Sequence, residues 1–241
     1  MSSTPVRLAD VDPFSCVDGP GNRFVVFVQG CPFDCLACHN PETIPPHGPE
    51  TRGTTVRALL KQIRLAEPFI RGVTVSGGEP TGQWPFVRNL FTRLHADPQL
   101  RRLTAYVDTN GHALPRVWDQ LLPVTDGFMV DLKALDPEVH RHLTGRSNAL
   151  VLDSIRYLHG HDRLAEVRLL LVPGHNDTPE QLARTAAWLA DLDPSIRVVM
   201  IGFRPHGVRP PLSDLPEATP ELLEQARATL EAAGMTQVVT I

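Results

Sequence analysis

The chain has 241 residues, a formal net charge of −4, and 42% hydrophobic residues. This length allows one large domain, and the apolar content supports a buried core rather than a disordered chain. The slightly acidic balance excludes a nucleic-acid binder that depends on bulk positive charge. The sequence contains neither a signal-like N-terminal stretch nor an apolar run long enough for a membrane span, so a cytoplasmic protein without membrane partners is expected.

Short apolar runs alternate with amphipathic stretches along the chain. Runs of aliphatic and β-branched residues predict strands over 23–29, 72–75, 103–107, 127–132, 166–172, 197–202 and 236–241. Helical periodicity predicts helices over 56–66, 84–95, 114–122, 150–159, 179–192 and 220–233. The expected helix ends are Thr54 or Thr55 and Thr178 as N-caps, Pro115 in a first turn, and Gly234 after the last helix.

Strands that alternate with helices predict βαβ units around a parallel sheet. The number of repeats favours an α/β protein with a full or partial barrel over a doubly wound sheet. In both architectures a functional site lies at the carboxyl ends of the strands. We expect a single domain over 1–241, with a cysteine loop at 30–40 and residues 203–241 completing the edge of the barrel.

The segments that carry chemistry follow successive predicted strands. The cysteine loop comes after the first of them, SGGEP after the second, DTNG after the third, and DLK ends the fourth. Because parallel strands end at one edge of a sheet, residues that are far apart in the sequence are expected to meet there.

Three of the four cysteines lie in GCPFDCLACHN, with the spacing C-x3-C-x2-C. In a reducing compartment such a cluster indicates metal or redox chemistry, because thiolates bind zinc and iron–sulfur clusters. Held by only Cys31, Cys35 and Cys38, a four-iron cluster would keep one iron open to a substrate. A structural zinc site with His39 is an alternative, but His39 directly follows Cys38, which is a poor ligand spacing. Cys16 as a fourth ligand would close the site.

The glycine-rich and acidic motifs each have two interpretations. Ser76, Gly77, Gly78 and Glu79 form either a plain tight turn or a turn whose backbone binds the amino group of a ligand. DTNG is either a simple turn or the point where Asp108 faces the site.

Two further predicted strands carry charged residues with the same ambiguity. Met129, Asp131 and Lys133 alternate along one strand and therefore share a face, where the carboxylate and the lysine also form an ordinary ion pair. Arg168 has Glu166 as an alternative ion-pair partner on its own strand.

The ordered motifs VDGPG, QGC, CHNPET, SGGEP, VDTNG, MVDLK and RLLLVPGHND resemble the radical S-adenosylmethionine (SAM) superfamily. Within that superfamily they resemble the activating enzymes of glycyl radical enzymes, and the resemblance covers nearly the whole chain. It implies the α/β fold of this superfamily, a partial (β/α)6 TIM-like barrel of the radical SAM type.

The resemblance also implies a chemistry and its partners. The three clustered cysteines would hold a [4Fe–4S] cluster whose open iron binds the amino and carboxylate groups of SAM. One electron would cleave SAM to methionine and a 5′-deoxyadenosyl radical, which would take a hydrogen atom from a glycine of a partner glycyl radical enzyme. A flavodoxin or ferredoxin would donate the electron, and the activase would be a monomer.

Further residue roles follow from the resemblance alone. Arg168 would lie near the methionine carboxylate, Leu170 near the adenine, and His206 near the adenine or ribose. The complete expected SAM site is Ala37, Ser76, Gly77, Gly78, Glu79, Asp108, Asp131, Lys133, Arg168, Leu170 and His206. A monovalent cation would bind at Asp108, Thr109, Met129 and Asp131.

Two departures from the family pattern bear on the substrate. Ala37 stands where an aromatic residue is common, and GFRPHGVR replaces a tyrosine–histidine pattern after the sixth predicted strand. The alternatives to an activase are a radical SAM enzyme acting on a small molecule, such as a deazapurine, or on a natural-product peptide. A non-catalytic iron–sulfur or zinc protein is the remaining alternative.

Overall fold

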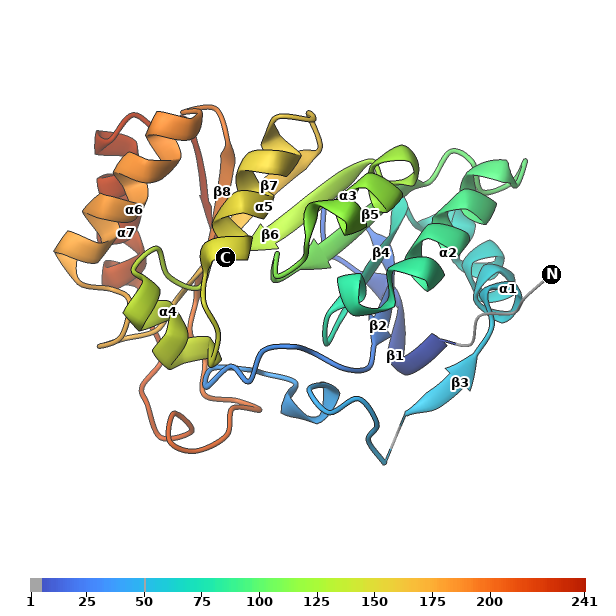
Figure 1. Ribbon diagram of the computed structural model, residues 1–241, viewed down its shortest axis with the longest axis horizontal. Coiled ribbons are helices and arrows are strands. Elements are labelled where there is room, and N and C mark those ends of the chain that lie inside the picture. Colours follow the sequence, from blue (N-terminus) through green and yellow to red (C-terminus); the bar gives the residue numbers. More distant parts are fainter. Residues whose placement is uncertain (1–5, 50) are drawn as a thin grey trace. The chain divides into compact units, whose positions relative to one another are not determined.

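The computed structural model describes residues 6–49 and 51–241, which form two compact units (Figure 1). The cysteine loop is divided between them, because Cys31 belongs to the first unit and Cys35 and Cys38 belong to the second. The single domain expected over 1–241, whose first five residues and residue 50 lie outside the described residues, stays a prediction. The first unit comprises 6–32, 42–109 and 113–129, and the second comprises 33–41, 110–112 and 130–241.

The first unit is built on strands in the order β3-β1-β2-β4-β5. β2, β4 and β5 run parallel, as predicted, but β1 pairs antiparallel with both β2 and β3. The expectation of a parallel sheet is therefore wrong at this edge, where two strands form from segments that we did not predict to be strands. The bounds are β1 (Val6–Ser15), β2 (Arg23–Val28), β3 (Arg52–Thr54), β4 (Gly72–Gly77) and β5 (Thr104–Thr109).

Three α-helices of the first unit match the predicted helices. They are α1 (Val56–Ala66), α2 (Trp84–Ala96) and α3 (Pro115–Leu121), and α1 packs against α2. Thr55 is the N-cap of α1, because its side chain accepts a hydrogen bond from the amide of Ala58 at 3.2 Å. Short 3-10 turns cover Pro41–Thr43, Glu67–Phe69, Pro80–Gln83 and Leu122–Val124.

Arg23 is fully buried at the start of β2. Its guanidinium donates to the Thr74 and Thr104 hydroxyls at 2.6 and 3.0 Å, and to the carbonyls of Pro20, Val73 and Thr104 at 2.9–3.1 Å. Burial lowers the pKa of Arg23 to about 10, so the group remains charged at neutral pH. Five acceptors for five N–H donors satisfy the whole side chain, which makes Arg23 a structural tie between β2, β4 and β5.

β6 (Gly127–Asp131) begins in the first unit and ends in the second. In the second unit β7 (Leu164–Leu171), β8 (Arg197–Gly202) and β9 (Gln237–Thr240) pair in parallel in that order. Its helices are α4 (Pro137–Thr144), α5 (Ala149–His159), α6 (Pro179–Leu192) and α7 (Pro220–Ala232). α6 and α7 lie side by side, as the orange and red helices of Figure 1 show.

The ends of these helices follow the local sequence. Thr178 caps α6 in a full capping box with Gln181, and Gly234, just past α7, has a φ of 103°. The sequence analysis missed α4, although Asp136 caps it and Gly145 closes it in the left-handed region with φ 73°. Of the helices in the described part of the chain, none combines the length and the apolar character needed to cross a membrane.

Candidate functional site

The SGGE turn lies directly against the residues that lead into the cysteine loop. The amide of Gly78 donates to the Val28 carbonyl at 2.8 Å, and the amide of Glu79 donates to the Gly30 carbonyl at 2.9 Å. A Cβ on Gly78 would lie 2.5 Å from the Gly30 oxygen, and Gly77 has φ 109° with a Cβ position 2.3 Å from the Val28 amide. Both glycines are therefore required for a close approach of backbone to backbone.

Polar side chains join the SGGE turn to the DTNG turn within the first unit. The buried Glu79 accepts through Oε1 from the amide and hydroxyl of Thr81, at 3.0 and 2.7 Å, and from the Thr109 hydroxyl at 2.6 Å. The Ser76 hydroxyl donates to Asp108 Oδ2 at 2.8 Å. Four of the predicted site residues thus meet at the ends of β4 and β5. Sequence reasoning missed Thr81, which fixes the Glu79 carboxylate.

The cysteine loop carries three reduced thiols. Cys31, Cys35 and Cys38 form no disulfide and are half-buried, and the amide of Cys38 donates to the Cys35 carbonyl at 3.3 Å, which makes a tight turn between these two. Burial raises the pKa of the Cys35 thiol to about 11, against an opposing effect of the Lys133 charge. Since thiolates are the metal ligands, binding a cluster here would displace this proton.

The donor set of the loop fits an iron–sulfur cluster better than a preformed zinc site. Within residues 6–49 and 51–241 no group of three His, Cys, Asp or Glu side chains stands arranged to hold a single metal ion. His39 is instead bound through its Nε2 to the Arg204 carbonyl at 2.9 Å. Three cysteine thiols are the soft ligands that iron–sulfur clusters use.

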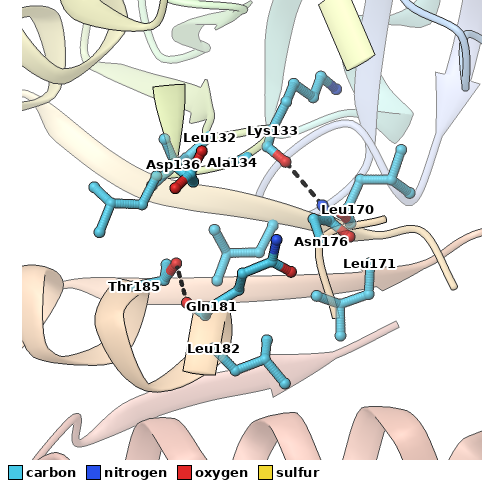
Figure 2. A pocket seen from close by; sticks show the side chains of 12 residues that line it. Leu132, Lys133, Ala134, Asp136, Leu170, Leu171, Asn176, Gln181, Leu182 and Thr185 are labelled. Atoms are coloured by element: carbon cyan, nitrogen blue, oxygen red, sulfur yellow. Dashed lines mark hydrogen bonds between the residues drawn. The ribbon is translucent and has the colours of Figure 1, made fainter. Parts of the chain in front are cut away.

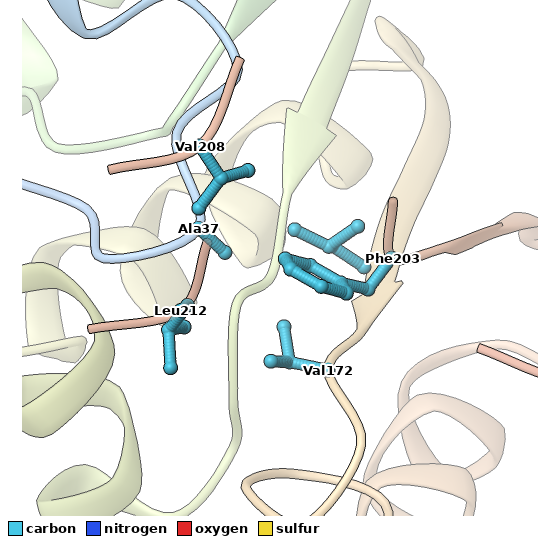
Figure 3. Close-up of a cluster of buried hydrophobic side chains, with 6 residues drawn as sticks. Ala37, Val172, Phe203, Val208 and Leu212 are labelled. Carbon is cyan, nitrogen blue, oxygen red and sulfur yellow. The ribbon is translucent and has the colours of Figure 1, made fainter. Parts of the chain in front are cut away.

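The second half of the cysteine loop is fixed by α4 and by an apolar cluster. The amides of Asp34 and Leu36 donate to the Thr144 and Leu143 carbonyls at 3.0 and 2.9 Å, at the end of α4. Ala37 is buried in a cluster whose members come from β7 and from the chain that follows β7 and β8 (Figure 3). The other members are Leu170, Val172, Phe203, Val208 and Leu212. The structure thus brings Ala37 together with Leu170, and Phe203 supplies an aromatic ring near the small side chain.

Asp131 and Lys133 form the expected ion pair at the end of β6, with Nζ 2.7 Å from Oδ2. Asn176 holds the backbone at Lys133 against β7. Its side-chain amide donates to the Lys133 carbonyl at 2.8 Å and to the Leu170 carbonyl at 2.7 Å (Figure 2). The pocket beneath this segment has a volume of about 20 Å³, which suits a single water. It is therefore no substrate pocket. The sequence analysis assigned no role to Asn176.

Arg168, His206 and Met129 are the remaining predicted residues. Arg168 Nε is 2.7 Å from Glu166 Oε1, so the alternative pairing foreseen on this strand is present. Arg197 adds a second contact to the same carboxylate at 3.3 Å. His206 is exposed and Met129 is fully buried. The roles of these residues toward SAM or a cation stay predictions.

His140 lies buried under the cysteine loop. Phe33 packs against its ring with centroids 5.6 Å apart and against the ring of His112 at 5.2 Å. Within the described residues no hydrogen bond of ordinary geometry reaches either ring nitrogen of His140, although the Ala134 backbone lies close enough to favour the protonated ring. Burial lowers the pKa of His140 to about 4, and the charges of Lys133 and His112 act in the same direction, while the Ala134 backbone opposes them. The imidazole is therefore neutral in the folded chain.

Between pH 7 and pH 5 the cluster-free protein is expected to lose about 2 kcal/mol of unfolding free energy through His140. The unfolded ring takes up a proton below its ordinary pKa of 6.5, whereas the folded ring resists protonation down to about 4. The contribution of the neutral His140 ring to the free energy of unfolding is therefore complete above pH 6.5, and it falls as the pH drops toward 4. Urea unfolding across this range measures it. His140→Leu should flatten the dependence and the exposed control His142→Gln should not, so equal slopes in all three proteins would contradict this role.

The comparisons with known proteins agree on one family. The radical SAM superfamily model matches residues 25–189. The pyruvate formate-lyase-activating enzyme of Staphylococcus epidermidis is 34% identical over 212 residues, which are 84% of this chain and 82% of that protein. The pyruvate formate-lyase 1-activating enzyme of Escherichia coli is 32% identical over 240 residues, with 91% and 95% covered.

The solved structures show the fold. A radical SAM methyltransferase from Sphaerobacter thermophilus superposes with a TM-score of 0.69 at 19% sequence identity, covering 99% of this chain and 76% of that one. The predicted α/β class, a partial (β/α)6 TIM-like barrel of the radical SAM type, is thereby confirmed. Together with the family match and the two activating enzymes, this leads to one conclusion. The chain belongs to the radical SAM superfamily, within the family of the pyruvate formate-lyase-activating enzymes.

Proposed function

We propose that this enzyme installs a radical on a glycine of a partner glycyl radical enzyme. The observation that carries the proposal is the attachment of the SGGE turn to the entrance of the cysteine loop, through the Gly78 and Glu79 amides. That contact puts the motif expected to bind the amino group of SAM beside the residue that precedes Cys31. The extent of identity with the two activating enzymes supports a glycyl radical enzyme as the protein substrate.

The cofactors of this superfamily are a [4Fe–4S] cluster and SAM, and this enzyme uses both. When bound, they supply a 5′-deoxyadenosyl radical that abstracts hydrogen. In our proposal Cys31, Cys35 and Cys38 hold the cluster and leave one iron open. The chain orients the nucleotide and keeps water away from it.

The first unit would contribute Ser76, Gly77, Gly78 and Glu79 to the amino group of SAM. The network of Glu79 with Thr81 and Thr109 supports this role, because it holds the buried carboxylate in one orientation. Asp108, fixed by the Ser76 hydroxyl, would face the ligand and a monovalent cation together with Thr109, Met129 and Asp131.

The second unit would contribute Ala37, Asp131, Lys133, Arg168, Leu170 and His206 to SAM. The ion pair between Asp131 and Lys133 holds both side chains at the end of β6. Arg168 is almost fully buried beside Glu166, which sets the direction of its guanidinium. The proposal also includes a flavodoxin or ferredoxin as electron donor, a monomeric state and a cytoplasmic location.

An anaerobic assay tests the function. The reconstituted enzyme is incubated with SAM and dithionite, and then with the glycyl radical enzyme encoded beside it, if its genome holds one, or with pyruvate formate-lyase. Formation of 5′-deoxyadenosine together with a glycyl signal in electron paramagnetic resonance is expected. Formation of 5′-deoxyadenosine without that signal on any partner would overturn the activase and favour a small-molecule or peptide substrate. No 5′-deoxyadenosine at all would contradict SAM cleavage.

A further inference from the structure

The β8 loop, residues 203–212, contacts the cysteine loop on both sides of its last two cysteines. His39, which follows Cys38, donates from Nε2 to the Arg204 carbonyl at 2.9 Å. Arg209 forms an ion pair with Asp34, and its guanidinium lies 3.5 Å from the Cys35 carbonyl. These contacts all lie within the second unit, and they join segments that are more than 160 residues apart in the sequence.

Gly207 lies close to the backbone of the cysteine loop. A Cβ at this position would lie 2.6 Å from the His39 carbonyl oxygen, and Gly207 has φ 80°. The neighbouring atom belongs to the backbone, so no flexible side chain can move aside. A larger residue at 207 would have to push the chain beside Cys38 out of its place.

Apolar packing explains why the β8 loop lies so close. Phe203, Val208 and Leu212 enclose Ala37, which lies between Cys35 and Cys38 (Figure 3). The small side chain at 37 packs in the same buried cluster as these three residues. The two departures from the family pattern therefore contact each other: Ala37 packs against residues of the segment that follows the sixth predicted strand.

We propose that the β8 loop positions Cys35 and Cys38 for cluster binding, with Gly207 and Arg209 as positioning residues. The segment that carries both thiols contains no helix or strand, so its backbone follows the contacts that it makes. Two sets of contacts hold it: the carbonyls at the end of α4 and the β8 loop. Groups that orient metal ligands in this way change metal affinity about 10- to 100-fold when they are lost. The inference rests on the proposed function, because it takes these thiols as cluster ligands.

The first test compares Gly207→Ala with Gly174→Ala. Gly174 is a matched control, since it also has a positive φ, 75°, but nothing lies within 4 Å of its Cβ position. After anaerobic reconstitution, Gly207→Ala is expected to bind iron about 10- to 100-fold more weakly in competition with a chelator. The residual reduced cluster should also give an altered electron paramagnetic resonance spectrum. The Gly174 variant should match the wild type in both measurements.

The second test needs no cluster and uses the alkylation rates of Cys35 and Cys38 in the iron-free protein, read by peptide mass spectrometry. Both rates should rise in Gly207→Ala, and the Cys35 rate should rise about two- to fivefold in Arg209→Ala. Arg227→Ala is the control for the latter, because Arg227 is a surface arginine with ion pairs to Glu224 and Glu231 only within its own helix.

The outcomes separate this inference from the proposed function. Alkylation rates in Gly207→Ala and Arg209→Ala equal to their controls would overturn the positioning role, whatever the iron content. Wild-type protein that takes up no iron, while the alkylation rates differ as expected, would instead refute the cluster site and support the loop contact. If Gly207→Ala does not fold, the comparison of Arg209→Ala with Arg227→Ala decides alone.

Discussion

Cys35→Ala is expected to lose both the iron–sulfur cluster and all formation of 5′-deoxyadenosine. Three thiolates are the minimum set in the loop, and two cannot hold a four-iron cluster with only one open corner. The half-buried Cys35 also forms the turn that leads to Cys38. Iron and sulfide analysis after anaerobic reconstitution, followed by chromatography of the SAM cleavage products, measures the result.

Cys16→Ala is the matched control for this experiment. Cys16 is exposed, and its Sγ lies 3.5 Å from Asn22 Oδ1. We expect this variant to keep its cluster and its SAM cleavage at wild-type level. Loss of the cluster in Cys16→Ala would support a site closed by four thiolates, whereas retention of SAM cleavage in Cys35→Ala would contradict the three-cysteine site.

The sequence predicted the regular part of the fold because its signals are local. β8 and the helices α1 and α6 have the predicted bounds, since apolar periodicity and capping threonines define them without reference to the rest of the chain. β1 was missed for a physical reason. Its residues VRLADVDPFS mix charges and a proline with the apolar positions, as suits a strand outside the parallel core.

The contacts of the candidate site were likewise predictable from the sequence only in part. The pairs Ser76 with Asp108 and Asp131 with Lys133 follow from their places at the ends of predicted strands. The contact of Gly207 with His39 does not follow, because no pattern in GFRPHGVR identifies which distant segment it meets. Irregular loops take their positions from tertiary packing, and a single sequence does not encode that packing in a readable period.

Replacing Arg23 by methionine is expected to destabilise the protein by about 3–5 kcal/mol, the largest effect on stability that we predict for a single side chain. Methionine has a similar length but no donors, so two hydroxyls and three carbonyls lose the guanidinium as a donor. The ring of Tyr106, 4.5 Å from the guanidinium carbon, loses a cation–π contact as well. Urea unfolding of the iron-free protein at pH 7 measures the change.

Arg23→Lys separates charge from geometry at the same position. A lysine keeps the charge but cannot reach five acceptors in a planar fork, so it should recover only part of the lost stability. Arg88→Met serves as the control, because Arg88 is exposed and its guanidinium donates to Gln120 Oε1 at 2.8 Å, and a change within about 0.5 kcal/mol is expected there. If Arg23→Met unfolded at the same urea concentration as Arg88→Met, the five bonds would contribute nothing net, and the tie between β2, β4 and β5 would have to come from apolar packing alone.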